Sequence, residues 1–290
     1  MAKIKIMTDS ASDISYELEK ENDILIVPFK IAIGGQSYVS RVDFDNEKFY
    51  RLMDENDEIP LTSQITVTEY MDIFEKLYSE GYTDVINVTI NANGSATYNN
   101  SVMAAQQFIE EHPDAQGKFR VYTINGNSYS GAYGYAVIQA AQKAKKGTPA
   151  EEIVNYVTDW VNNARIYFAP YSLRYAKKSG RIPSAAAFAG ELMGLRPIMK
   201  ISSGVITTAG KVRGDKAINP KIIDFTLKDM IPQTPYSVTY GSDKSVGDEL
   251  AAAMTKKLGY PPAEYFQIGA AIAANAGPKV SGLIFKAQNG

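Results

Sequence analysis

The chain has 290 residues, 45% of them hydrophobic and 21% charged, which is enough for two folded domains with sizeable cores. Its net charge of -2, without a Lys/Arg run interleaved with aromatic residues, argues against nucleic acid as a partner. The chain contains no cysteine, which excludes disulfides, thiolate nucleophiles and iron–sulfur clusters. Because no apolar stretch approaches the ~18 residues of a membrane span and no signal segment precedes Asp9, we expect a cytoplasmic protein.

The first predicted elements are short strands separated by polar loops. A strand over 3–7 ends in the loop TDSASDI, and strand segments over 23–40 turn at Gly34-Gly35. The polar loop LTSQIT then leads into a predicted helix over 68–81, whose N-cap is Thr66 or Thr68.

The stretch NANGSATYNNS lies between a predicted buried strand over 84–90 and a predicted helix over 101–112. At this end of a strand, the unpaired N–H groups and the dipole of the following helix favour an anion. Ser95 and Thr97 are therefore candidates for binding a carboxylate or phosphate, while Ser95 is also a candidate nucleophile. The single histidine, His112, is predicted at the far end of the helix, so a Ser-His-Asp triad lacks an obvious base.

Further strand–loop–helix units follow, with a strand over 119–124, the loop NGNSYSG and an Ala- and Gly-rich helix ending near residue 147. This alternation predicts an α/β fold with a mainly parallel sheet, helices on both faces and a ligand site beyond the C-terminal ends of the strands. The loops there are rich in hydroxyls and amides. Since neither G-x-x-x-x-G-K-[ST] nor G-x-G-x-x-G occurs, a single carboxylate is favoured over a nucleotide.

The composition changes after the predicted strand over 165–170, where Gly, Ala and Met become frequent. We therefore expect an α/β domain over 1–165 and a smaller α+β domain over 166–290 that closes over the site. The elements predicted for the second domain are a strand over 236–241, a helix over 246–259, a strand over 265–274, a loop over 275–279 and a strand over 281–287.

A segment of the second domain, residues 185–199, is apolar on nearly every side. It suits the wall of a tunnel for an apolar ligand, and equally an interior helix that packs the two domains together. In the first case burial of each methylene group contributes roughly 0.8 kcal/mol, so the apolar part of the ligand dominates affinity. The candidate contacts with an apolar ligand chain are Phe188, Leu192, Met193 and Ile198.

Several motifs occur in a definite order along the chain: TDSASDI, LTSQ (61–64), Ser-x-Thr (95–97), LRYAKKSGRI (173–182), GLRPIMKISSGVI (194–206), KVRG (211–214) and NAGP (275–278). This set resembles the DegV family of bacterial fatty-acid-binding proteins across essentially the whole chain. The resemblance implies a lipid carrier without a cofactor that encloses one long-chain fatty acid between two domains. It also implies a fatty-acid kinase as partner in members that have one, and transient membrane contact would allow lipid exchange.

Position by position, the resemblance places carboxylate-binding residues at Thr62, Ser95 and Arg181. Thr97 belongs to the same Ser-x-Thr motif, and Asn275 stands where the family has His. Asn275 can donate a hydrogen bond but cannot carry a proton or charge. The alternative interpretations are cap or turn hydroxyls for Thr62 and Ser95, and an interdomain salt bridge for Arg181.

The competing function is enzymatic. In that interpretation Ser95 is the transient nucleophile of an acyl or phosphoryl transferase or hydrolase. Because the sequence offers no convincing base, we expect a binding protein that is not an enzyme.

Overall fold

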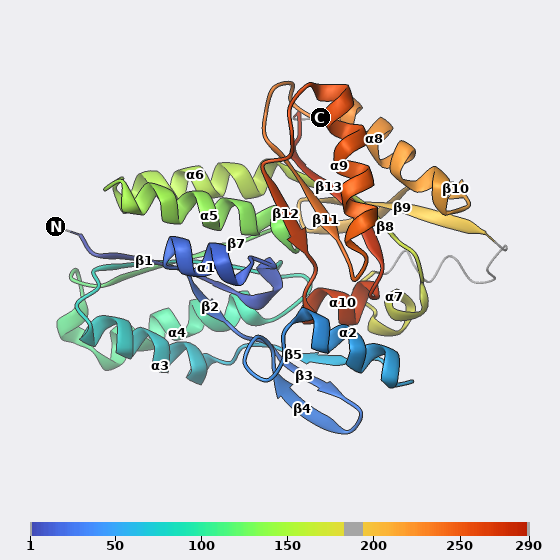
Figure 1. Cartoon of the computed structure of the whole chain (residues 1–290). Coiled ribbons are helices and arrows are strands. Elements are labelled where there is room, and N and C mark those ends of the chain that lie inside the picture. Colours follow the sequence, from blue (N-terminus) through green and yellow to red (C-terminus); the bar gives the residue numbers. More distant parts are fainter. Residues whose placement is uncertain (1, 183–193, 289–290) are drawn as a thin grey trace.

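The computed structural model describes residues 2–182 and 194–288 of the chain (Figure 1). The first sheet has four parallel strands in the order β2-β1-β6-β7. Its strands are β1 (Ile4–Asp9), β2 (Leu25–Val27), β6 (Asp84–Thr89) and β7 (Arg120–Asn125). Every residue of β6 is buried, as expected for a central strand of a sheet covered on both faces. The predicted parallel α/β fold is therefore confirmed.

Helices cover both faces of this sheet: α5 and α6 lie on one face, and α3 and α4 on the other (Figure 1). The helices of this region are α1 (Tyr16–Asn22), α3 (Val67–Ser79), α4 (Thr97–Glu111), α5 (Gly131–Lys145) and α6 (Ala150–Asn163). Thr66 caps α3 in a reciprocal capping box with Glu69. Helix α4 begins at Thr97, earlier than predicted, so Ser95 lies immediately before its first turn.

A small antiparallel sheet, in the order β4-β3-β5, contains Thr62, which was predicted in a loop but lies in its edge strand β5. It consists of β3 (Lys30–Ile33), β4 (Gln36–Val39) and β5 (Leu61–Ser63), with α2 (Asn46–Glu55) between β4 and β5. The predicted turn joins β3 to β4, and Gly34 and Gly35 have φ of +58° and +72° there. Left-handed values at both positions are typical of the two-residue turns that glycine favours in hairpins.

The second sheet has six strands in the order β10-β9-β8-β13-β11-β12, and only its β11–β12 pair is parallel. Its strands are β8 (Ala164–Pro170), β9 (Leu195–Ser202), β10 (Val205–Arg213), β11 (Tyr236–Tyr240), β12 (Glu264–Gln267) and β13 (Val280–Lys286). One face packs against α8 (Ile218–Asp229) and α9 (Lys244–Leu258) in a core of its own. The other face joins the larger core of the N-terminal part. The division at 165/166 remains a proposal for the domain boundary, and it falls within β8, the first strand of this sheet along the chain.

The prediction of a strand over 265–274 is wrong. Strand β12 ends at Gln267, and residues Ala270–Ala276 form helix α10, which packs near α7 (Arg174–Ser179). Gly269 is the N-cap, in extended backbone conformation, and the alanines that follow have high helix propensity. This helix contributes cavity residues, including Asn275. Within the described residues, none of the helices combines the length and apolar character needed to cross a membrane.

Candidate functional site

A cavity of about 770 Å³ lies beyond the C-terminal ends of the parallel strands and is lined by the loops that follow them and by strands of the six-stranded sheet. Strand β1 continues to β2 on one side of the sheet, and β6 continues to β7 on the other. The loops after β1 and β6 therefore diverge, which creates the crevice where open α/β sheets bind ligands. The cavity volume falls within the range of roughly 300–1,000 Å³ typical of small-molecule sites.

Most of the cavity wall is aliphatic or aromatic. Its apolar residues come from the segments after β2, β6 and α7, from β8, β9, β10 and β13, and from α10 and the residue before its cap: Phe29, Ile90, Ile166, Phe168, Ile182, Ile201, Val205, Ile206, Ile268, Ala271, Ile272, Ala276 and Val280. Around Ser95 the wall is polar, and the lining residues Gln64, Asn93, Asn99 and Arg181 are exposed. The cavity thus combines a polar, solvent-accessible mouth with a buried apolar interior.

Ser95 reaches the cavity from the loop before α4 and hydrogen-bonds to Thr97 behind it. The two hydroxyl oxygens are 2.9 Å apart, and the Thr97 backbone N–H donates to Ser95 Oγ at 3.3 Å. Thr97 itself is fully buried. When the Thr97 hydroxyl donates to Ser95, the Ser95 proton is free to donate to an anion in the cavity. Thr97 thus orients Ser95 and is not one of the lining residues.

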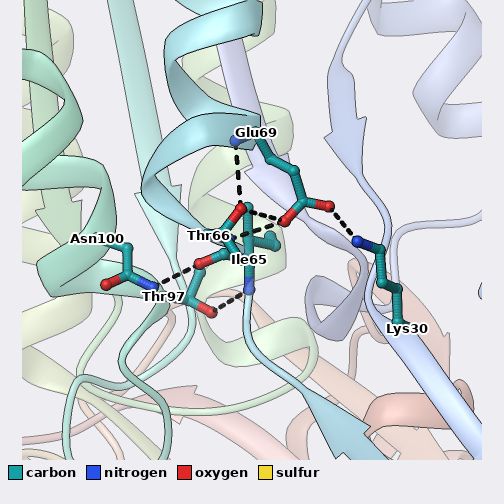
Figure 2. Close-up of polar contacts among 6 residues, drawn as sticks. All are labelled: Lys30, Ile65, Thr66, Glu69, Thr97 and Asn100. Atoms are coloured by element: carbon teal, nitrogen blue, oxygen red, sulfur yellow. Dashed lines mark hydrogen bonds and ion pairs between the residues drawn. The ribbon is translucent and has the colours of Figure 1, made fainter.

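Thr97 also connects the loop before α4 (residues 90–96) to the segment that contains Thr62. The Ile65 N–H donates to Thr97 Oγ1 at 3.3 Å, and Asn100 Nδ2 donates to the Ile65 carbonyl at 2.7 Å (Figure 2). Both backbone groups of Ile65 are therefore bonded to α4. This clamp holds β5 and the start of α3 beside the start of α4, which places Thr62 and Ser95 on one cavity wall.

The structure brings four of the predicted carboxylate-binding residues to this cavity: Thr62, Ser95, Arg181 and Asn275 all line it. Arg181 is exposed, and its Nη1 donates to the Ser179 carbonyl at 2.8 Å. Asn275 Nδ2 donates to the Ala271 carbonyl one turn earlier in α10, at 2.8 Å. Its second amide proton is the one that could reach a ligand.

None of the predicted contacts with the acyl chain is found among the described residues that line the cavity. Phe188, Leu192 and Met193 lie outside the described residues. Ile198 is fully buried in the second core, on the face of β9 that packs against α8 and α9. Because side chains alternate along a strand, Ile201 of the same strand faces the cavity instead.

Asn91 is a site residue that the sequence analysis missed. Its side chain is fully buried, and Nδ2 donates to the Gly204 carbonyl at 2.8 Å and to Tyr129 Oη at 3.0 Å. Gly204 lies in the turn between β9 and β10. Asn91 therefore holds that hairpin against the loop before α4 (residues 90–96). A Cβ atom on Gly204 would lie 2.7 Å from Asn91 Oδ1, which leaves only glycine room there. Burial raises the pKa of Tyr129, while Asn91 and the Arg181 charge partly offset this.

Two buried carboxylates support the loops around the cavity. Asp9 accepts hydrogen bonds from the Ile90 N–H (2.6 Å), the Ala11 N–H (3.1 Å) and the Tyr133 hydroxyl (2.6 Å). Asp13 accepts one from the Gly269 N–H at 2.8 Å, whereas its Oδ2 has no hydrogen-bond partner within residues 2–182 and 194–288. Burial raises the pKa of Asp9 to about 6 and that of Asp13 to about 7.

His112 lies at the opposite end of α4 from Ser95. Its ring stacks on Phe108 with centroids 4.6 Å apart, and Nε2 is 3.6 Å from a carboxylate oxygen of Glu75. Among the residues that the structure describes, Ser95 forms its hydrogen bonds with Thr97, so it is paired there with a hydroxyl and not with a base. In the described ranges, the His, Asp and Glu side chains form no cluster suited to a metal ion.

Comparison with known proteins identifies relatives of the whole chain. The sequence profile of the family described as "uncharacterised protein, DegV family" matches residues 3–288. A DegV domain-containing protein from Caldanaerobacter subterraneus subsp. tengcongensis is 31% identical over 288 residues, which is 99% of each chain.

Solved structures share the fold. A stearic acid-binding protein from Eubacterium ventriosum has a TM-score of 0.86 and 26% identity, with 99% of this chain and 98% of that chain covered. A DegV lipid-binding protein from Thermotoga maritima has a TM-score of 0.85 and 24% identity, with 99% and 100% covered.

The two carboxylates should respond differently to the same substitution. The pKa values of Asp9 and Asp13 are raised in the folded state. Between about pH 4 and about pH 7 the folded protein therefore binds more protons than the unfolded chain, and its stability falls as pH rises through this range. Asp13→Asn should raise the melting temperature at pH 8 and flatten this fall, since an amide replaces a carboxylate oxygen without a partner. Asp9→Asn should lower stability, because its NH₂ group would face N–H and O–H donors. Thermal unfolding at several pH values tests both, and an unaltered pH dependence in Asp13→Asn would contradict the assignment.

Proposed function

Because this chain belongs to the DegV family, we propose that it binds a long-chain fatty acid in the cavity between the two large sheets and presents its carboxylate at the mouth. One observation carries the proposal: an apolar cavity ends in a cluster of hydroxyl, amide and guanidinium donors. The similar protein from Eubacterium ventriosum binds stearic acid, which is a ligand of this class.

In this proposal the carboxylate accepts hydrogen bonds from Ser95, Thr62 and the second amide proton of Asn275, with the Arg181 charge nearby. A carboxylate left unpaired in an apolar site would cost several kcal/mol, and donors remove that cost. Arg181 is exposed, so solvent screens its attraction. The neutral donors therefore supply the directional contacts, and Arg181 favours the anion over the protonated acid.

The acyl chain extends along the apolar wall formed by β8, β9 and α10, where Phe168, Ile201 and Ile272 line the cavity. Each buried methylene contributes roughly 0.8 kcal/mol, so the tail supplies most of the affinity. Phe188, Leu192 and Met193 remain proposed tail contacts on the strength of the sequence pattern alone.

We propose a carrier and not an enzyme, since Ser95 is paired with the Thr97 hydroxyl. Native mass spectrometry of the purified protein distinguishes the two: a carrier shows the mass of a lipid that is lost on denaturation. An adduct on Ser95 that survives denaturation would instead identify a covalent acyl or phosphoryl intermediate. Transfer of the lipid to and from vesicles tests the transient membrane contact that a carrier requires.

Replacing Ser95 with Ala should weaken binding of octadecanoic acid by about 1–3 kcal/mol, because the charged carboxylate loses one hydrogen-bond donor. Isothermal titration calorimetry on the delipidated protein measures the change. Ser63→Ala is a matched control, since Ser63 lies on β5 beside Thr62 but is exposed outside the cavity lining. Equal affinities of Ser95→Ala and the wild type would remove Ser95 from the head-group site.

The pH dependence of binding should reflect Asn275. Asn does not titrate and His112 lies at the far end of α4, so no histidine should contribute an inflection at about pH 6.5 to wild-type affinity. Any inflection set by Asp13, whose pKa burial raises to about 7, should persist in His112→Gln. Asn275→His should introduce one, with tighter binding on the acidic side where the imidazolium attracts the carboxylate. Titrations from about pH 5 to about pH 8 measure this. A wild-type inflection that disappears in His112→Gln would place the histidine in the site and refute the expectation.

We further propose a fatty-acid kinase as partner, on the basis of the family resemblance. Arg213 is exposed at the end of β10, beyond the strand residues that line the cavity. Arg213→Ala should slow phosphorylation of the bound lipid by a cognate kinase, because loss of a rim charge mainly lowers the association rate. Arg51→Ala on α2 is the control for a surface charge elsewhere. If both variants are phosphorylated at the wild-type rate, Arg213 has no role in docking.

A further inference from the structure

Ser130 has an unusual backbone conformation on the cavity wall. It precedes α5 with φ of +56° and ψ of -147°, a region populated almost solely by glycine and costing about 1–3 kcal/mol for other residues. Its N–H donates to the Ala11 carbonyl at 3.0 Å, and its carbonyl accepts from the Gly134 N–H at 3.2 Å. These two bonds hold the strained backbone in place. The residue is 3% exposed, yet it lines the cavity.

The hydroxyl of Thr239 in the six-stranded sheet lies next to the Ser130 hydroxyl. Thr239 of β11 is also 3% exposed and lines the cavity, and its Oγ1 is 3.4 Å from Ser130 Oγ. This separation is well beyond the ~2.7–2.8 Å of a good hydroxyl–hydroxyl bond. The pair is therefore weakly satisfied, although both groups are removed from bulk water.

An acceptor lies close to this pair. The Asp13 carboxylate is 7% exposed, its Oδ2 lacks a hydrogen-bond partner, and the Ser130 hydroxyl is near enough to favour its ionised form. When Ser130 donates its one hydroxyl proton toward Asp13, its oxygen can only accept, and the Thr239 hydroxyl can donate to that oxygen or to another group. The three groups come from β11 and from the loops after β1 and before α5. Partly satisfied buried networks of this kind are costly unless another group completes them.

We infer that Ser130 and Thr239 form a second polar subsite, which binds a hydroxyl group carried on the acyl chain, so that hydroxy fatty acids belong to the ligand class. This rests on the proposed fatty-acid binding. A ligand hydroxyl can donate to the Ser130 oxygen while it accepts from Thr239. A carboxylate is excluded there because Asp13 lies behind Ser130, and this agrees with a head group at the Arg181 end. A ketone oxygen accepts but cannot donate, so it completes only half of the network.

The test compares octadecanoic acid with a series of monohydroxy-octadecanoic acids that differ only in the position of the hydroxyl, and with the corresponding ketone. At least one hydroxy acid should bind the wild type more tightly than octadecanoic acid and than the matching ketone. Thr239→Val keeps the side-chain shape but removes the hydroxyl. It should reduce the preference for that hydroxy acid over octadecanoic acid by about tenfold.

Two further variants make the result decisive. Thr226→Val is the matched control, because Thr226 is a fully buried threonine of α8 with an unpartnered hydroxyl outside the cavity lining, and its preference should equal that of the wild type. Ser130→Gly should reduce the preference while raising the melting temperature through relief of backbone strain. The inference is overturned if octadecanoic acid binds and every hydroxy acid binds no better, or if both site variants keep the wild-type preference. Failure of all the acids to bind would refute the proposed function itself.

Discussion

The loops around the cavity depend on one buried carboxylate. Asp9 ends β1 and accepts hydrogen bonds from the backbone N–H groups of Ala11 and Ile90 and from the hydroxyl of Tyr133 in α5. It therefore fixes the ends of two parallel strands at the point where their connections diverge, and it fixes α5 relative to both. Burying a carboxylate is costly, and burial raises its pKa to about 6, but three donors offset much of that cost. Ser95 and Ser130 lie in the loops that these donors help to position.

The second sheet is attached around the cavity through hydrogen bonds from side chains to backbone groups. Asn91 donates to the Gly204 carbonyl, Asp13 accepts from the Gly269 N–H, and the Tyr50 hydroxyl donates to the Ile268 carbonyl. Two of these contacts meet the start of α10, the helix that brings Asn275 to the cavity. Asp13 thus supports the proposed carboxylate site through α10, and the proposed polar subsite through Ser130. A change at Asp13 is therefore expected to affect both.

Features encoded in short stretches could be predicted from the sequence, whereas those set by distant partners could not. The buried strand β6, the Thr66 cap and the hydroxyls of Ser95 and Thr97 follow from local patterns. Helix α10 was missed because residues 268–274 form one short apolar run, which does not distinguish a buried strand from a helix. Its start is fixed by Asp13, which is far away in sequence. Ile198 was assigned to the cavity because both faces of β9 are buried, so apolar character does not distinguish it from Ile201.

The distribution of charge along the cavity favours one direction of ligand binding. The mouth is lined by exposed polar residues and Arg181, while the interior is apolar apart from Ser130 and Thr239, with Asp13 behind them. A fatty acid that entered head first would bring its carboxylate toward Asp13, so repulsion and desolvation would both oppose that direction. Entering tail first, it leaves its charge near solvent and buries only methylenes. In the carrier that we propose, the carboxylate is then accessible to a second protein while the tail is enclosed.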